Sequence, residues 1–84
     1  MNFKDATDLL FDGITQGDLA KILGISIASI RQARLREGAK AHRAPPNNWE
    51  KAVITLAAKR IREYQRLITK LSVEQQRSLP LQGS

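Results

Sequence analysis

A chain of 84 residues is long enough for one small domain, and its 42% hydrophobic residues can form a single modest core. The formal net charge is +6, which favours an anionic partner, with nucleic acid ahead of an anionic membrane. The chain contains no cysteine, so disulfides and thiolate metal sites are excluded. No apolar run approaches the roughly 20 residues of a membrane span, and the first residues do not read as a signal peptide. We therefore expect no membrane partner.

The first predicted helix covers residues 3–12. Ala6, Leu9 and Leu10 recur at helical spacing, and Asn2 is a suitable amino-terminal cap. The Asp12-Gly13 pair indicates where this helix stops.

A second helix is predicted over residues 16–23. Thr15 and Asp18 have the spacing of a capping box, and the small Ala20 allows another helix to cross closely. Gly24 permits the positive φ of a tight turn between helices, and Ile25 fills the space beneath that turn.

The third predicted helix covers residues 27–37, with Ser26 as its amino-terminal cap and Gly38 ending it in the left-handed conformation. Ile30 and Ala33 lie on its inner face. The same helix carries Arg31, Gln32, Arg34 and Arg36, side chains that suit base edges and phosphates.

Residues 38–48 have no periodic pattern and contain Pro45-Pro46, which predicts a loop. This loop carries Lys40, His42 and Arg43. The net charge is −2 over residues 1–24, +4 over residues 25–48 and +4 over residues 49–84, so the positive charge begins near the third helix.

A long last helix is predicted to begin at Trp49, with Asn47 as its cap, and to end at Leu71. Its first half shows a broad apolar face that includes Ile54, as expected for burial in the core. Its second half narrows to a 3-4-3 spacing that is typical of a seam between two helices. The predicted dimerisation residues are Ile61, Tyr64, Ile68 and Leu71. Residues 72–84 are polar and are predicted to form a flexible tail.

The span from Gln16 to Arg34 resembles the helix-turn-helix of the lambda repressor/Cro-like, or xenobiotic-response-element, class of phage and prokaryotic regulators. The matching positions are Gln16, Leu19, Ala20, Leu23, Gly24, Ile25, Ser26 and Ile30. The resemblance implies an all-α, four-helix fold, a symmetric dimer, and a second motif helix that lies in the major groove. It also implies a cytoplasmic, nucleoid-associated protein whose partner is double-stranded DNA.

By this resemblance, residues 26–34, beginning at Ser26, enter the major groove and Gln16 touches a phosphate. Arg31 and Gln32 are expected to read bases, with Gln32 suited to adenine and Arg31 to guanine or a phosphate. Ile27 and Ala28 occupy places where family members often have polar residues. They either contact thymine methyl groups, or pack against the protein, or contribute nothing to DNA binding. The residues expected to contact phosphates are Arg34, Arg36, Lys40 and Arg43.

We thus expect a DNA-binding region over residues 1–46, a long helix over residues 47–71 that completes the core and dimerises, and a tail over residues 72–84. The predicted function is that of a dimeric transcriptional regulator, with repression as its simplest mechanism. The alternative is a protein-interaction or antitoxin-like module that uses the long helix. No catalytic arrangement, metal site, cofactor or small-molecule substrate is expected, because the sequence shows no nucleophile motif, no metal-ligand spacing and no phosphate-binding loop.

Overall fold

Four α-helices and no strand make up the part of the chain that the structure, a computed structural model, describes: residues 1–78, with side chains up to residue 76. The helices are α1 (Phe3–Leu10), α2 (Gln16–Leu23), α3 (Ile27–Ala33) and α4 (Trp49–Ser78). The predicted all-α class is confirmed.

Local signals in the sequence set the beginnings of the first three helices. The Asn2 side chain accepts from the Asp5 N–H at 2.8 Å. Thr15 and Asp18 form a complete capping box at the start of α2, where each side chain accepts from the backbone N–H of the other residue. Gly24 follows α2 with φ 70°, a conformation that glycine adopts without the steric cost of a Cβ. The predicted bounds of α2 are confirmed.

Two of the predicted helix ends are wrong. The first helix ends at Leu10 rather than at residue 12, and α3 ends at Ala33 rather than at residue 37. In a longer α3 the Gln32 carbonyl would accept from residue 36, but it accepts from the N–H groups of Leu35 and Arg43 at 3.3 and 3.2 Å. The chain therefore folds back on α3 at this point. Gly38 does not take the predicted left-handed conformation, since Gly24 alone has a positive φ among the described residues.

The last helix begins where it was predicted but extends further. The residue before it is Asn48, whose carbonyl accepts from the Ala52 N–H at 3.2 Å, so Asn47 is not the cap residue. The helix continues to Ser78, so its predicted end at Leu71 is wrong, and residues 72–78 of the predicted tail are helical. The rest of that predicted tail, residues 79–84, lies outside the described residues.

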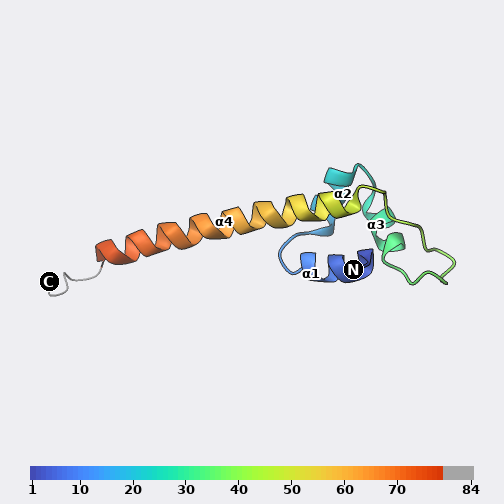
Figure 1. The fold of residues 1–84 in the computed structure, drawn as a ribbon, viewed down its shortest axis with the longest axis horizontal. Helices are drawn as coiled ribbons and strands as arrows, with labels where there is room; N and C mark the ends of the chain where they lie inside the picture. The colour runs from blue at the N-terminus through green and yellow to red at the C-terminus, as the bar shows by residue number, and fades with distance from the viewer. Residues whose placement is uncertain (79–84) are drawn as a thin grey trace.

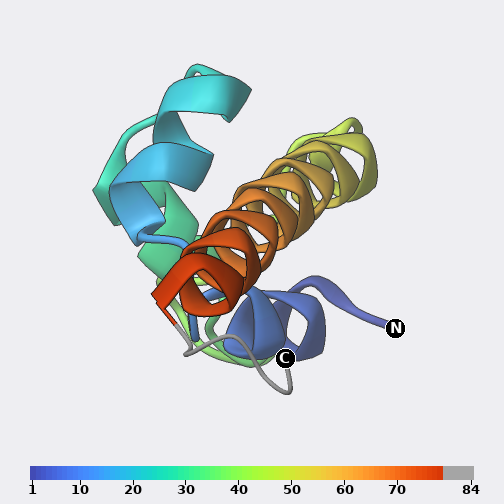
Figure 2. The ribbon, with the colours of Figure 1, turned by 90° about the vertical axis from the view of Figure 1, so that its left-hand side faces the viewer.

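The first three helices gather around the amino-terminal third of α4, and the remainder of α4 extends away from them as a single rod (Figure 1). The principal extents are 67 × 21 × 19 Å. Viewed along the rod, α1 and α2 lie on two different sides of α4 (Figure 2), and both pack against it. We call α1–α3 together with residues 49–60 the head, and residues 61–76 the shaft.

The core of the head is built from apolar side chains that all four helices and the α1–α2 connection contribute. Its buried hydrophobic members are Phe3, Ala6, Leu10, Ile14, Leu19, Ala20, Ile30, Ala33, Ala52 and Leu56. The rings of Phe3 and Trp49 meet edge to face with centroids 5.3 Å apart, which fixes the start of α4 against α1. Ile54 is not part of this core, because it is 68% exposed; the broad apolar face predicted for α4 is narrower than expected.

Candidate nucleic-acid interface

Several exposed side chains lie on the outer face of α3, next to the capped amino-terminal end of this helix. Ser26 accepts from the Ser29 N–H at 3.0 Å, and the two hydroxyl groups lie 3.0 Å apart. Ile27, Ala28 and Arg31 are exposed. Ile30 on the opposite side of the same helix is fully buried. The helix is therefore anchored on its inner face, and its outer face is free to meet a partner.

The turn between α2 and α3 is compact. The Ile25 N–H donates to the Ala20 carbonyl at 3.0 Å, and the Gly24 N–H donates to the Lys21 carbonyl at 3.3 Å. Both Ala20 and Ile30 are buried, in agreement with a close crossing of the two helices. The chain thus passes from one helix to the next through Gly24, Ile25 and Ser26.

The amino-terminal turns of α2 and α3 lie side by side. A Cβ placed on Gly17 would be 3.9 Å from Ile27 Cδ1, so a side chain of α3 reaches the start of α2. Gln16 is half-buried at this place, and its Oε1 is buried with no hydrogen-bond partner among the described residues. Gly17 and Ile27 therefore lie close together, and the predicted residues Gln16 and Ser26 are their neighbours in the chain.

Arg34 makes contacts with α1 and with the residue that follows this helix. Its guanidinium pairs with the Asp8 carboxylate and lies 5.1 Å from the centroid of the Phe11 ring. This side chain therefore holds the end of α3 against α1, and the phosphate contact expected of Arg34 stays a prediction. This pairing could not be predicted from a local pattern, since Asp8 and Arg34 are 26 positions apart.

The same Asp8 carboxylate also accepts from Lys4 Nζ at 2.6 Å, one helical turn earlier. The hydrogen bond from Lys4 has the largest effect on the pKa of Asp8 and lowers it; desolvation opposes this effect, and the hydrogen bond from Arg34 lowers the pKa again. Asp8 thus stays charged and keeps the two cations in place.

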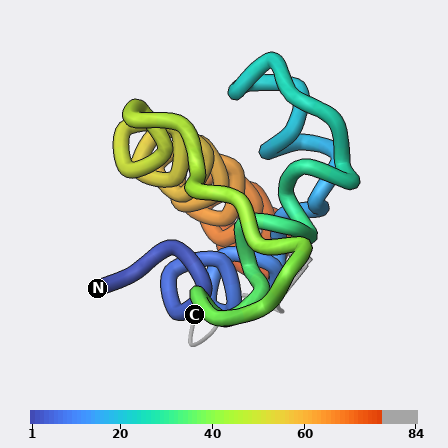
Figure 3. Tube along the Cα trace, turned by 90° about the vertical axis from the view of Figure 1, so that its right-hand side faces the viewer, coloured from blue at the N-terminus to red at the C-terminus, as the bar shows by residue number. Residues whose placement is uncertain are grey.

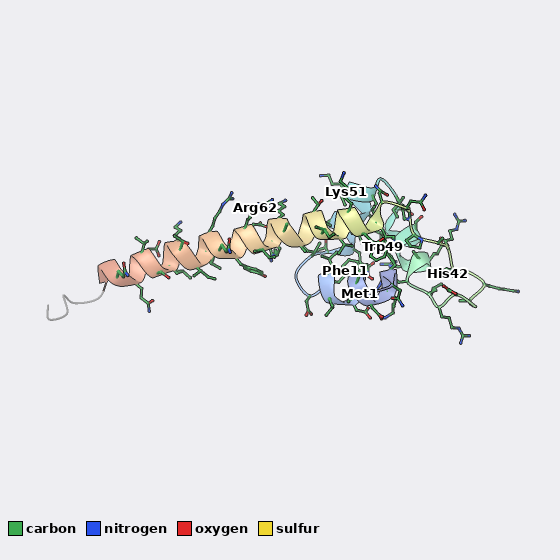
Figure 4. All side chains as sticks on the ribbon, in the orientation of Figure 1. Met1, Phe11, His42, Trp49, Lys51 and Arg62 are labelled. Atoms are coloured by element: carbon green, nitrogen blue, oxygen red, sulfur yellow. The ribbon has the colours of Figure 1, made fainter. Side chains whose placement is uncertain are left out.

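The segment between α3 and α4 forms the far end of the head (Figure 3). It is tied back to α3 by the hydrogen bond from the Arg43 N–H to the Gln32 carbonyl, and it turns through hydrogen bonds from Ala39 to Arg36 and from His42 to Ala39. Arg36, Lys40 and Arg43 are exposed. Figure 4 shows side chains of this segment, among them His42, projecting beyond the end of α4. Three cations therefore follow α3 on the same end of the head, and Gln32 is half-buried beside them.

The predicted dimerisation residues all lie on the shaft, where every residue from 61 to 76 is exposed. Ile61, Tyr64, Ile68 and Leu71 are 58%, 48%, 63% and 55% exposed. Tyr64 also borders the head, because its ring lies 4.8 Å from the guanidinium of Arg60 and its hydroxyl would be 3.7 Å from a Cβ on Gly13. In Figure 4 the side chains of the shaft, with Arg62 labelled, point away from the helix on all sides.

Other kinds of site find no support in the described part of the chain. No group of three or more His, Cys, Asp or Glu side chains there is placed to hold a metal ion. Among residues 1–78, no helix combines the length and the apolar character that crossing a membrane requires.

The fold and this surface define an all-helical protein with a small basic head and a long helical shaft. Comparisons with protein-family models, with curated proteins and with solved structures found no match to the chain.

Proposed function

We propose that the chain is a sequence-specific double-stranded DNA-binding regulator of transcription that acts as a homodimeric repressor. In this proposal α2 and α3 are the two helices of a lambda repressor-like helix-turn-helix, and α3 enters the major groove. The supporting observation is the exposed outer face of α3, where Ile27, Ala28 and Arg31 are uncovered while Ile30 anchors the opposite face in the core.

The size of α3 fits this role. A major groove about 12 Å wide admits one α-helix, and base contacts come from the residues on its outer face. Arg31 and Gln32 supply the donors and acceptors that pair with guanine and adenine, and Ile27 and Ala28 supply apolar contacts that suit a thymine methyl group. Repression follows from occupying the operator, which needs no further domain.

The charge distribution supports the same proposal. Arg36, Lys40 and Arg43 are exposed directly after α3, on a segment that is hydrogen-bonded back to Gln32. Contacts between such cations and phosphates position a protein on DNA without reading its sequence. Arg34 differs from these three cations because it is engaged with Asp8.

The test is the binding of duplex DNA by the intact protein, with in vitro selection from random duplexes to find the preferred site. An enriched palindrome and an affinity that falls steeply with salt are expected, since bound cations release counterions from DNA. Arg31→Ala should weaken binding to the selected site by about 1–3 kcal/mol and leave binding to random DNA nearly unchanged. Glu50→Gln, on the exposed start of α4, is the matched control. Absence of salt-sensitive binding would overturn the proposal.

A second candidate function is a protein-interaction module of the antitoxin-like kind, and the exposed apolar side chains of the shaft favour it. In that case the shaft binds a different protein and the head is a scaffold. Reversing the charge of Arg31 separates the two candidates, because an interaction module would keep its partner and a DNA-binding protein would lose its operator.

A further inference from the structure

The shaft carries an apolar stripe of exposed side chains, and one of them, Tyr64, also meets the head, since the Arg60 guanidinium lies 4.8 Å from its ring. Its members follow the heptad pattern of a two-helix seam: Ile61 and Ile68 are seven residues apart, as are Tyr64 and Leu71. A lone helix of this length is marginal in water, since most helical stability in proteins comes from burial of one face. The shaft therefore needs a partner helix along this stripe.

We propose that the partner is the shaft of a second copy of this chain, running antiparallel, with Ile61 opposite the partner's Leu71 and Tyr64 opposite the partner's Ile68. This proposal gives an orientation and a register to the homodimer of the proposed function, on which it rests. The twofold symmetry repeats each pairing, so the seam consists of four apolar layers centred near Arg66.

The charges beside the stripe decide the orientation. Arg60 lies directly before Ile61, and Glu74 lies three residues after Leu71; both occupy the same flank of the seam, each seven residues from Leu67. In an antiparallel pair this flank meets the same flank of the other helix. Within its own chain Arg60 pairs with Glu63 at 3.8 Å and lies over the Tyr64 ring, but its side chain stays 40% exposed. In the antiparallel pair Arg60 therefore also faces the partner's Glu74 at each end of the seam, and Leu67 faces the partner's Leu67 between them.

A parallel pair of shafts does not bring Arg60 opposite the partner's Glu74. In that orientation Arg60 faces the partner's Gln65, and Leu67 faces the partner's Ser72, so no opposite charges meet. The extension of α4 to Ser78 is essential here, because it places Glu74 on the helix and in register with the seam.

The register is also determined by the flanking residues. If the two shafts were moved past each other by one heptad, so that each tip lay closer to the partner's head, Arg60 would face the partner's Leu67 and Glu74 would face the partner's Val53. Both charges would then face apolar side chains. In the proposed register Ala57, at the edge of the head, lies opposite the partner's Gln75. The heads then lie at opposite ends of the dimer.

The remaining cations of the shaft do not oppose this arrangement. Arg62, Arg66 and Lys70 occupy heptad positions outside the stripe and its flanks, and all three are exposed. The strongly basic face thus stays in water when the seam closes, and like charges are kept apart.

Engineered cysteines test the orientation directly, because the chain contains none of its own. In the proposed dimer the two copies of Ile61 are separated by ten residues of helix, about 15 Å along the axis, too far for a disulfide. Ile61→Cys alone should therefore stay monomeric on non-reducing gels after oxidation. The double variant Ile61→Cys, Leu71→Cys should form a covalent dimer, and Arg66→Cys, on the face away from the seam, controls for random collisions.

A charge exchange gives a second readout. Glu74→Arg, far from the head, should weaken dimerisation roughly tenfold in analytical ultracentrifugation, since two symmetric ion pairs are lost. Adding Arg60→Glu should recover part of the lost affinity, because the pairs between the two chains re-form with opposite signs, while the contacts of Arg60 with Glu63 and with the Tyr64 ring are lost. Arg66→Glu is the matched control and should leave dimerisation unchanged.

The outcomes separate this inference from the DNA-binding proposal, because neither measurement involves DNA. Efficient crosslinking of Ile61→Cys alone, failure of the charge exchange to recover any of the lost affinity, or a protein that stays monomeric at all concentrations would overturn the antiparallel seam. Crosslinking as expected in a protein that does not bind DNA would leave the seam standing and overturn the proposed function instead.

Discussion

Arg34, the residue directly after α3, is paired with Asp8 of α1 and stacked over Phe11. This contact joins the helix that presents the candidate DNA-binding face to the helix that packs on α4. The orientation of α3 is therefore fixed from its carboxyl end by an ion pair and from its inner face by the buried Ile30.

The pairing predicts a dependence of stability on pH. The pKa of Asp8 is lower in the folded protein than in the unfolded chain, where an aspartate titrates near 3.9. Its stabilising contribution is therefore present above about pH 4 and is lost as the pH falls through the lower folded value. Asp8→Asn should be less stable than the wild type at pH 7, and the difference should shrink by pH 3 in urea unfolding measured by circular dichroism.

The control for this experiment is Asp12→Asn, since Asp12 is exposed and makes no ion pair among the described residues. A difference between Asp8→Asn and the wild type that is the same at pH 3 and pH 7 would contradict the role given to the charge.

Two glycines provide a matched comparison of backbone strain. A Cβ would meet no atom within 4 Å at either Gly24 or Gly38, but only Gly24 has a positive φ. Gly24→Ala should lower the free energy of unfolding by about 1 kcal/mol through the cost of the left-handed conformation. Gly38→Ala should be neutral or slightly stabilising. Equal losses in both variants would mean that Gly38 also needs a glycine-specific backbone conformation.

Local signals predicted the beginnings of α1, α2 and α3, because a cap involves residues only a few positions apart. Asn2, Thr15, Ser26 and Gly24 all act as their sequence context indicated. The end of α3 was not predictable in this way. It depends on the contact of Arg34 with α1 and on the return of Arg43 to Gln32, which are set by tertiary structure.

The far end of α4 contains two opposing signals in its sequence. No Gly or Pro occurs between Trp49 and Ser78, although the residues after Leu71 are polar. Polarity predicted fraying, whereas the absence of helix breakers predicted continuation, and the helix continues. For the candidate interface, the sequence placed Ile27, Ala28 and Arg31 on one outer face, and all three are exposed. It could not show that Arg34 turns away from them.

Leu56 and Ile54, two residues apart on α4, test which side of this helix faces the core. Leu56 is 8% exposed and Ile54 is 68% exposed. Leu56→Ala should lower the free energy of unfolding by about 2–5 kcal/mol, because it removes buried methyl groups and leaves a cavity. Ile54→Ala should change it by less than about 0.5 kcal/mol. Thermal unfolding of the two variants under the same conditions measures the contrast, and a large loss for Ile54→Ala would place this residue in an interface.

Lys40 and Arg43 test the positioning role of the segment after α3. Both side chains are exposed, and the Arg43 backbone is held to Gln32, so removal of either charge should leave the fold intact. If each contacts one phosphate, Lys40→Ala and Arg43→Ala should each weaken binding to selected and random duplexes alike. Each should also reduce the slope of log affinity against log salt by about 1. Fluorescence anisotropy between 50 and 200 mM salt, about the range over which such slopes are resolved, gives both quantities.

Lys51→Ala, on the exposed start of α4, is the matched control. A selective loss on the enriched site would make Lys40 or Arg43 a reader of bases, and an unchanged slope in both variants would remove this segment from the DNA interface.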